Sequence, residues 1–308
     1  MAAAGRFMRL LGWRYSEDPE KRQPFRRSFE PLGVVVDLTD SGDGIVRIKN
    51  KPSRVVTICG AIKEIVTTKV FPHHAAPVLR GKLQHAEGQV FARIMALMMQ
   101  EVRARAGGRL AGSWVSPGME EELLWAEWFL QTAAPRELRA ADTRPPLLIF
   151  SDAALEGMQD EKATLGAIMF DEEYSEYFQG QLERGQLAVL QRQTTKVIAV
   201  LEVLPVVMAA HFWRARALHR RVFFFVDNDA ARAALIKMHS DVETIKAVLK
   251  MHAAVMTKSP SFPWYARVPS ASNCSDRISR MEEPAQKAVK VEVSIGDFVR
   301  TEKKRRKT

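Results

Sequence analysis

Two apolar runs that each end in an aspartate constrain the fold of this chain more than any other feature. The run Leu147–Phe150 is followed by Ser151 and Asp152, and the run Val222–Val226 is followed directly by Asp227. Short apolar runs of this kind are typical of buried strands. Ligands gather at strand ends in α/β sheets, so an acid there is less easily explained by solvation than one on a helix surface. For either aspartate alone, a turn or a helix cap is the alternative.

Two further carboxylates lie in segments that we expect to be helical. Glu202 stands within an apolar stretch, where its burial is costly unless it is paired or binds a metal ion; a glutamate at the helix edge is the alternative. Asp276 lies in the last expected helix, where the alternative is an acid that stabilises the helix dipole. Together with Asp152 and Asp227, they suit two Mg²⁺ or Mn²⁺ ions, which can assist phosphodiester hydrolysis.

Charge and composition restrict the partners and the compartment. The chain has 308 residues and a formal net charge of +10, which favours a polyanion such as nucleic acid or an acidic membrane surface. The alternative is an ordinary protein with two basic ends. Two distant cysteines, Cys59 and Cys274, exclude a disulfide framework and a zinc site and favour an intracellular location, nuclear or cytoplasmic. Without an uncharged apolar run of about 18 residues, we expect no membrane span.

Both ends of the chain are basic, and we expect tails at residues 1–28 and 284–308. The segment Met1–Tyr15 has three arginines and no acid, a weak resemblance to an organelle-targeting peptide, although short basic starts are common. The run Lys303–Lys307 is most simply a solvated tail that adds salt-sensitive affinity for any nucleic acid. A nuclear-localisation signal is the alternative.

Between the tails, hydrophobic periodicity indicates two regions, residues 29–142 and 143–283. In the first we expect strands Gly33–Leu38 and Ile45–Ile48 as a hairpin, helices Pro52–Lys69, Pro77–Arg103 and Met119–Leu130, and a linker from Ala133 to Pro146. In the second we expect strands Leu147–Ser151, Thr164–Phe170, Tyr174–Gly180, Val222–Val226 and Trp264–Val268, and helices Thr194–Leu218, Ala230–Met238, Val242–Met256 and Ser272–Met281. This order is typical of a mixed α/β layer fold.

The order and the local context of the four carboxylates resemble ribonuclease H. The matching segments are Ser151–Ala153, Val200–Leu204, Val226–Ala231 and Val268–Arg280, the last of which looks like the terminal motif of tyrosine-recombinase retrotransposons. The resemblance covers about residues 145–283. It implies a five-stranded mixed sheet flanked by helices, with Asp152, Glu202, Asp227 and Asp276 as catalytic, metal-binding residues.

The first region resembles the part of a reverse transcriptase that precedes ribonuclease H. Phe29–Asp37 resembles the segment after the palm, Leu79–Gln89 the thumb helix, and Glu122–Leu130 the connection. The chain has no Tyr-x-Asp-Asp polymerase motif. The resemblance therefore implies the C-terminal part of a retroelement reverse transcriptase: a smaller, mostly helical thumb/connection-like region with a hairpin, then a ribonuclease H-like domain.

The implied activity is Mg²⁺-dependent cleavage of the RNA strand of an RNA–DNA hybrid, with the strands distinguished by the 2′-hydroxyl. Three departures favour the alternative, an inactive ribonuclease H fold that binds nucleic acid or serves in assembly. Pro205 should kink the helix that carries Glu202. An acidic insertion, Glu156–Glu161, follows the first strand, and no histidine lies between His252 and Asp276.

Three arginines are the expected contacts to nucleic acid. Arg277 and Arg280 lie one turn apart beside Asp276, and Arg214 lies near the end of the long helix. For the first two, ion pairs with Asp276 or Glu283 are the alternative; for Arg214, it is the favourable placement of a cation at a helix C-terminus. We expect Trp264, Tyr265 and Trp213 in the core rather than as base-stacking platforms, and Asp229 as the N-cap of the helix at Ala230.

Overall fold

A four-stranded antiparallel sheet forms part of the first region of the chain. The computed structural model describes residues 10–11, 26–90, 93–140, 142–157, 162–172, 174–296 and 298. The strands are, in sheet order, β1 (Ser28–Phe29), β2 (Val34–Asp37), β3 (Ile45–Asn50) and β4 (Arg136–Arg139). The β2–β3 pairing confirms the predicted hairpin. The linker prediction is wrong in part, because β4 lies within it; Glu137 of β4 pairs with Arg47 of β3 across the ladder, at 3.4 Å.

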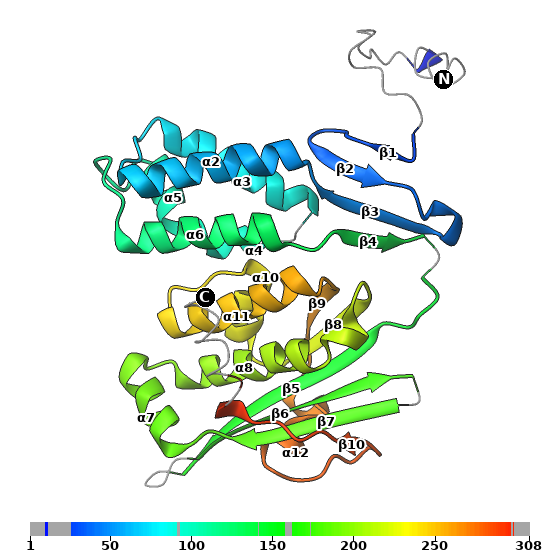
Figure 1. Ribbon diagram of the computed structural model, residues 1–308. Helices are drawn as coiled ribbons and strands as arrows, with labels where there is room; N and C mark the ends of the chain where they lie inside the picture. Colours follow the sequence, from blue (N-terminus) through cyan, green and yellow to red (C-terminus); the bar gives the residue numbers. More distant parts are fainter. Residues whose placement is uncertain are drawn as a thin grey trace.

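Helices complete the first region and lie beside this sheet (Figure 1). They are α2 (Pro52–Thr68), α3 (Ala75–Val90), α4 (Ile94–Leu97), α5 (Gln100–Ala106) and α6 (Pro117–Thr132). The prediction of one helix over Pro77–Arg103 is wrong. The chain leaves helical geometry at Arg93, which has a φ of 50°, and all six residues from Ile94 to Met99 are buried. A straight surface helix exposes one face and cannot bury six consecutive side chains. The interruption of the helix therefore allows all six apolar side chains to be buried.

A second, mixed sheet organises the rest of the chain. Its order is β10-β7-β6-β5-β8-β9, with β5 (Leu147–Glu156), β6 (Lys162–Asp171), β7 (Tyr174–Gln181), β8 (Arg221–Val226), β9 (Phe262–Arg267) and β10 (Val289–Lys290). β5 and β8 are adjacent and parallel, as expected, and β8 and β9 are also parallel. The fold is therefore mixed α/β.

The described part of this sheet has six strands rather than the predicted five. The additional strand, β10, pairs in parallel with β7 and comes from the segment expected as a polar tail. Ile295 and Phe298 of the same segment are buried. Ile295 lies over Gly180 of β7. Part of the segment expected as a tail is therefore packed against the rest of the protein.

The helices of this region are α7 (Arg184–Gln193), α8 (Val197–Phe212), α9 (Arg214–Ala217), α10 (Asp229–Lys237), α11 (Glu243–Lys258) and α12 (Asp276–Ser279). Three predictions need correction. The helix expected over Thr194–Leu218 ends at Phe212, and the last helix is a single turn. The N-cap of α10 is Asn228 rather than Asp229, because the Asn228 side chain accepts a hydrogen bond from the Ala231 N–H at 3.0 Å.

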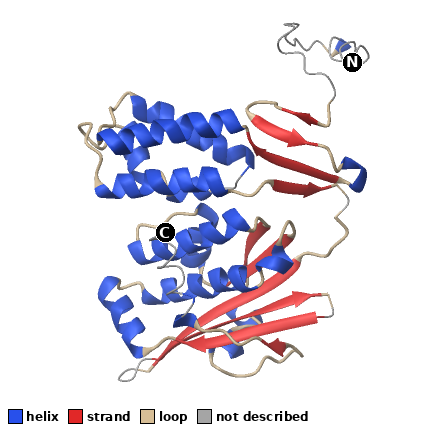
Figure 2. Ribbon diagram, viewed as in Figure 1, coloured by secondary structure: helices blue, strands red, loops and turns tan. Residues whose placement is uncertain are grey.

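The sheet is covered on both faces. Successive side chains of a strand point to opposite faces. On β5, Ile149 belongs to the main core with α8, whereas Phe150 packs in a second cluster with Ile278 of α12. α8 and α12 therefore cover opposite faces, as the arrangement of helices and strands in Figure 2 also shows. Gly166 of β6 is required beneath α12, because a Cβ there would lie 2.5 Å from Ile278 Cγ2.

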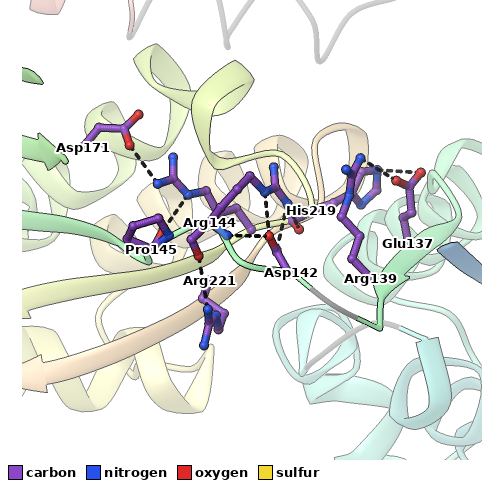
Figure 3. A network of polar contacts seen from close by, with 9 residues as sticks. Glu137, Arg139, Asp142, Arg144, Pro145, Asp171, His219 and Arg221 are labelled. Atoms are coloured by element: carbon purple, nitrogen blue, oxygen red, sulfur yellow. Dashed lines mark hydrogen bonds and ion pairs between the residues drawn. The ribbon is translucent and has the colours of Figure 1, made fainter. Parts of the chain in front are cut away.

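The segment that joins the two regions is held by arginines (Figure 3). Arg220, buried to 6% exposure, donates to the Pro145 carbonyl at 2.7 Å and pairs with Asp171 at 2.7 Å. Arg221 donates to the Arg144 carbonyl, and Arg144 donates to the His219 carbonyl. The entry to β5 is thus fixed to the start of β8.

Among the residues that the structure describes, none of the helices has the length and apolar character needed to cross a membrane. The expected targeting segment Met1–Tyr15 lies almost wholly outside the described residues, as does the basic run Lys303–Lys307. The domain boundaries drawn from the sequence stay predictions.

Candidate active site

The carboxylate site lies where the pairing of two parallel strands ends. The β5–β8 ladder stops at the pair Phe150 and Phe225. β5 continues to Glu156 against β6, whereas β8 ends at Val226 and the chain turns away into α10. Beyond that last pair, β5 has no neighbour on its β8 side, and Asp152 and Asp227 lie at this edge.

α8 brings Glu202 to the same place. Its residues are almost all buried, because it packs on β5 and β6 on one side and against α10 and α11 on the other. Glu202 is 5% exposed, so the alternative of a glutamate that points into solvent is wrong. Pro205 lies inside α8, which nevertheless runs without interruption from Val197 to Phe212.

The three carboxylates converge. One ligand oxygen from each of Asp152, Glu202 and Asp227 lies within 4.8 Å of the other two. The expectation that Asp152 ends a strand is wrong, because β5 continues to Glu156. Asp227 follows the end of β8 and Glu202 lies in α8, as expected. Their catalytic role stays a prediction.

Hydrogen bonds orient some of the carboxylate oxygens and leave others without a partner. Ser279 Oγ donates to Asp152 Oδ2, and Ser270 Oγ donates to Asp227 Oδ2 at 2.9 Å. Glu202 Oε2 and Asp227 Oδ1 are buried and have no hydrogen-bond partner among the described residues. Buried acceptors of this kind are costly, and a cation is the group that would satisfy several of them at once.

Burial and mutual repulsion raise the pKa of two of these carboxyls. The pKa of Glu202 rises to about 9, first because burial penalises the anion and then because Asp152 and Asp227 are negative. Burial raises the pKa of Asp152 to about 6, against the lowering effect of the Ser279 hydrogen bond. Both shifts have the direction that a cluster of carboxylates without a cation produces, because each negative charge disfavours the ionisation of its neighbours.

Asp276 lies at the edge of the cluster. Its negative charge contributes to the raised pKa of Asp152, but it is not one of the three converging residues. Its side chain is 42% exposed and pairs with Arg280 at 3.3 Å. Arg280 also pairs with Glu156 at 2.8 Å, so this arginine links the end of β5 to α12.

The other two predicted nucleic-acid contacts lie in different surroundings. Arg277 pairs with Glu282 at 3.1 Å rather than with Asp276 or Glu283. Arg214 donates to the His211 carbonyl and follows the end of α8. Since a helix rises 1.5 Å per residue, the end of α8 at Phe212 is about 15 Å from Glu202. The structure therefore places Arg277 and Arg280 near the carboxylates and Arg214 away from them.

The sequence interpretation missed several residues that support the site. Ser270, Asn273 and Ser279 contact Asp227, the Ser151 carbonyl and Asp152, respectively. All three belong to the terminal motif Val268–Arg280, so its concentration of small polar residues was the available signal.

The expectation that Trp264 is a core residue is wrong, because its side chain is 65% exposed on the edge strand β9. The prediction holds for the other two aromatic residues. Trp213 is buried, and the Tyr265 ring stacks on Phe224 while its hydroxyl contacts His252.

Comparison with known proteins gives structural likenesses only. No protein-family model and no curated protein matches the chain. RNase H1 from the halophilic archaeon Halobacterium salinarum is similar to 42% of this chain over 89% of its own length, with 10% identity and a TM-score of 0.31. The foamy viral protease-reverse transcriptase, solved in complex with an RNA/DNA hybrid, is similar to 90% of this chain over 33% of its own length, with 9% identity and a TM-score of 0.33.

Proposed function

We propose that the chain is a Mg²⁺-dependent endonuclease that hydrolyses the RNA strand of RNA–DNA hybrids. One observation carries the proposal: three carboxylates from separate elements have ligand oxygens within 4.8 Å of one another. Glu202, the most deeply placed, is 5% exposed and has an unpartnered oxygen. A merely structural glutamate at that depth would be expected to have a hydrogen-bond partner.

The donor set fits a hard divalent cation. Asp152, Glu202 and Asp227 offer only carboxylate oxygens, which Mg²⁺ and Mn²⁺ prefer. When bound, Mg²⁺ would supply Lewis-acid stabilisation of the charge that develops on the phosphodiester and its leaving oxygen. The clustered carboxylates repel one another in the free protein, and the positive charge of a bound cation would relieve this repulsion.

The protein's own side chains provide orientation and proton exchange. Ser279 and Ser270 each hold one oxygen of Asp152 and Asp227, so the second oxygen of each carboxylate keeps a fixed direction. The side chain of Asp276 is 42% exposed and is placed to exchange a proton with water. Arg280 is held nearby by exposed ion pairs, and such pairs are worth only about 0–1 kcal/mol, so a substrate phosphate can replace them.

A cleavage assay tests the proposal. The substrates are an end-labelled RNA–DNA hybrid and an RNA–RNA duplex of the same sequence, with Mg²⁺ or with chelator. We expect the wild type to cut only the RNA of the hybrid, and only with metal. Asp152→Asn should lower the rate at least 100-fold, a typical loss for one electrostatic catalytic group. Asp241→Asn, a fully exposed residue, should cut like the wild type.

Two outcomes would contradict the proposal. Equal cleavage by the wild type and Asp152→Asn would assign the activity to another site. No cleavage, combined with no effect of Mg²⁺ on the melting temperature of the wild type, would leave the inactive binding or assembly module as the better account. A cation that binds only the native state must raise the melting temperature.

A further inference from the structure

A second site lies between the two regions of the chain, on the far side of β9 from β8. It is a cavity of about 530 Å³, which is within the usual range for small-ligand pockets. Its walls are the edge strand β9, the helices α10 and α11, and three residues of the first region, Arg93, Ile94 and Arg136. Figure 1 shows β9 and α10 directly beside the first region, where these walls meet.

The charge of the cavity is positive. Four arginines line it, and no aspartate or glutamate is among the lining residues: Arg93, Arg136, Arg232 and Arg267. Asp229, just outside, pairs with Arg232 at 3.2 Å and with Arg267 at 3.4 Å. The lining therefore offers guanidinium groups and no carboxylate, which suits an anion, and arginine is the side chain best matched to phosphate.

The cavity also has an aromatic wall. Trp264 is 65% exposed, although exposure of a large aromatic side chain to water is unfavourable. Tyr265 and His252 lie behind it in the lining. An exposed tryptophan among arginines is a combination that binds a flat aromatic ring joined to an anion.

A hydrogen-bonded pair, His252 and Tyr265, forms part of the wall of the cavity. His252 is 1% exposed, and its Nε2 lies 2.6 Å from the Tyr265 hydroxyl, whereas its Nδ1 is buried without a hydrogen-bond partner among the described residues. Burial lowers the pKa of His252 to about 4, so the ring is neutral at pH 7. The pair therefore adds no charge to the wall of the cavity.

The cavity reaches the edge of the sheet that carries the carboxylates. Arg267 ends β9 and lies opposite Val226, the residue before Asp227. Asp229, which pairs with Arg267, is two residues beyond Asp227. Arg267, which lines the cavity, is therefore also next to the strand end that carries Asp227.

We propose that the cavity binds one unpaired nucleotide, with the base stacked on Trp264 and the phosphate among the arginines. The ligand is a nucleoside monophosphate unit, either free or within a single strand. This site goes beyond the proposed function, because neither Trp264 nor the arginines require a metal ion.

The first experiment locates the ligand by ¹⁹F NMR of protein labelled with 5-fluorotryptophan, in chelator. The chain has six tryptophans, and Trp264→Phe and Trp114→Phe assign the two that are exposed among the residues that the structure describes. Adenosine monophosphate and a single-stranded DNA of about 10 nucleotides are the probes. We expect either probe to shift the Trp264 resonance and to leave that of Trp114, which is 63% exposed in the first region, unchanged.

The two probes distinguish a free nucleotide from a nucleotide within a strand, and they also show which result would contradict the proposal. A shift with the monophosphate alone identifies a free nucleotide, and a shift with both probes identifies a strand. Inorganic phosphate that causes the same shift would overturn the role of the base. A Trp264 resonance unmoved by both probes, or one that moves together with that of Trp114, would overturn the site itself.

The second experiment measures affinity for whichever probe binds. Trp264→Ala should weaken binding on the order of 10-fold, because a base–aromatic stack is lost. Trp264→Phe should recover most of that affinity, and Trp114→Ala should bind like the wild type. Repeating the measurement in the Asp152→Asn background separates this proposal from the nuclease: unchanged nucleotide affinity there supports an independent site, whereas lost affinity would show that the carboxylates bind the probe.

Discussion

Replacing Glu202 by glutamine should remove much of the pH dependence of the metal-free fold. The folded-state pKa of Glu202 is about 9, against an ordinary value of 4.5 for a glutamate carboxyl. The native state therefore holds a proton that the unfolded chain releases. The resulting stability is complete below pH 4.5 and is lost as the pH rises towards 9. Glutamine has a similar shape and does not titrate.

The size of the effect follows from proton linkage. Where only the native state binds the proton, the free energy of unfolding falls by about 1.4 kcal/mol per pH unit. Asp152, with a pKa of about 6, and His252, with a pKa of about 4, change their contribution mainly below pH 6.5. Burial raises the pKa of Glu87 and of Glu122 to about 7, so these two carboxyls also add to the loss of stability above pH 6.5, but they do so alike in the wild type and in the glutamine variant. Between pH 6.5 and 8.5, Glu202 should therefore account for a loss of about 2.7 kcal/mol that the glutamine variant lacks.

Urea unfolding followed by circular dichroism, in chelator at pH 6.5, 7.5 and 8.5, measures this slope. The comparison is between wild type, Glu202→Gln and Glu243→Gln, an exposed control at the start of α11. We expect the control to keep the wild-type slope. Equal slopes for the wild type and Glu202→Gln would refute the reasoning, because Glu202 would then be ionised in the folded state. Added Mg²⁺ should raise the stability of the wild type most at pH 8.5, where the carboxylates are least protonated.

Three further outcomes are expected. Gly166→Ala should destabilise the fold by about 1–3 kcal/mol because its Cβ would clash with Ile278. Gly60→Ala lies in a helix with open space around it and should stabilise the fold by about 0.5–1 kcal/mol. Thermal melting measures both variants, and an equal effect on the two would contradict the packing of α12. Deleting Lys303–Lys307 should weaken binding to all nucleic acids alike and reduce its salt dependence, a result that selective loss for one strand type would oppose. Primer extension by the purified chain should yield no DNA, since the polymerase motif is missing from the sequence.

Hydrophobic pattern was sufficient to predict the elements that build the carboxylate site. β5 begins with the apolar run Leu147–Phe150, β8 contains the apolar run Val222–Val226, and α8 is an apolar stretch too long for a strand. Because each of these patterns has one simple structural interpretation, the positions of Asp152, Glu202 and Asp227 followed from the sequence.

Other parts depend on tertiary packing that no local pattern reports. The run Ile94–Met99 has helical propensity, yet the predicted long helix is interrupted before it, and all six side chains are buried. β4 and β10 are short polar strands whose pairing partners are distant in sequence. Trp264 has the composition of a core residue, and only the position of β9 at the sheet edge exposes it.

The hydrogen bond between Ser279 and Asp152 can form only after the ribosome has synthesised the residues between them. The two residues are 127 positions apart. At 5–20 residues per second, a ribosome needs about 6–25 s to pass from one to the other. During that interval, Asp152 lacks its serine, and the face of the sheet that Ile278 covers is open. A nascent chain thus passes through a period in which an apolar sheet face is exposed and the carboxylate site is incomplete, and its final turn of helix closes both at once.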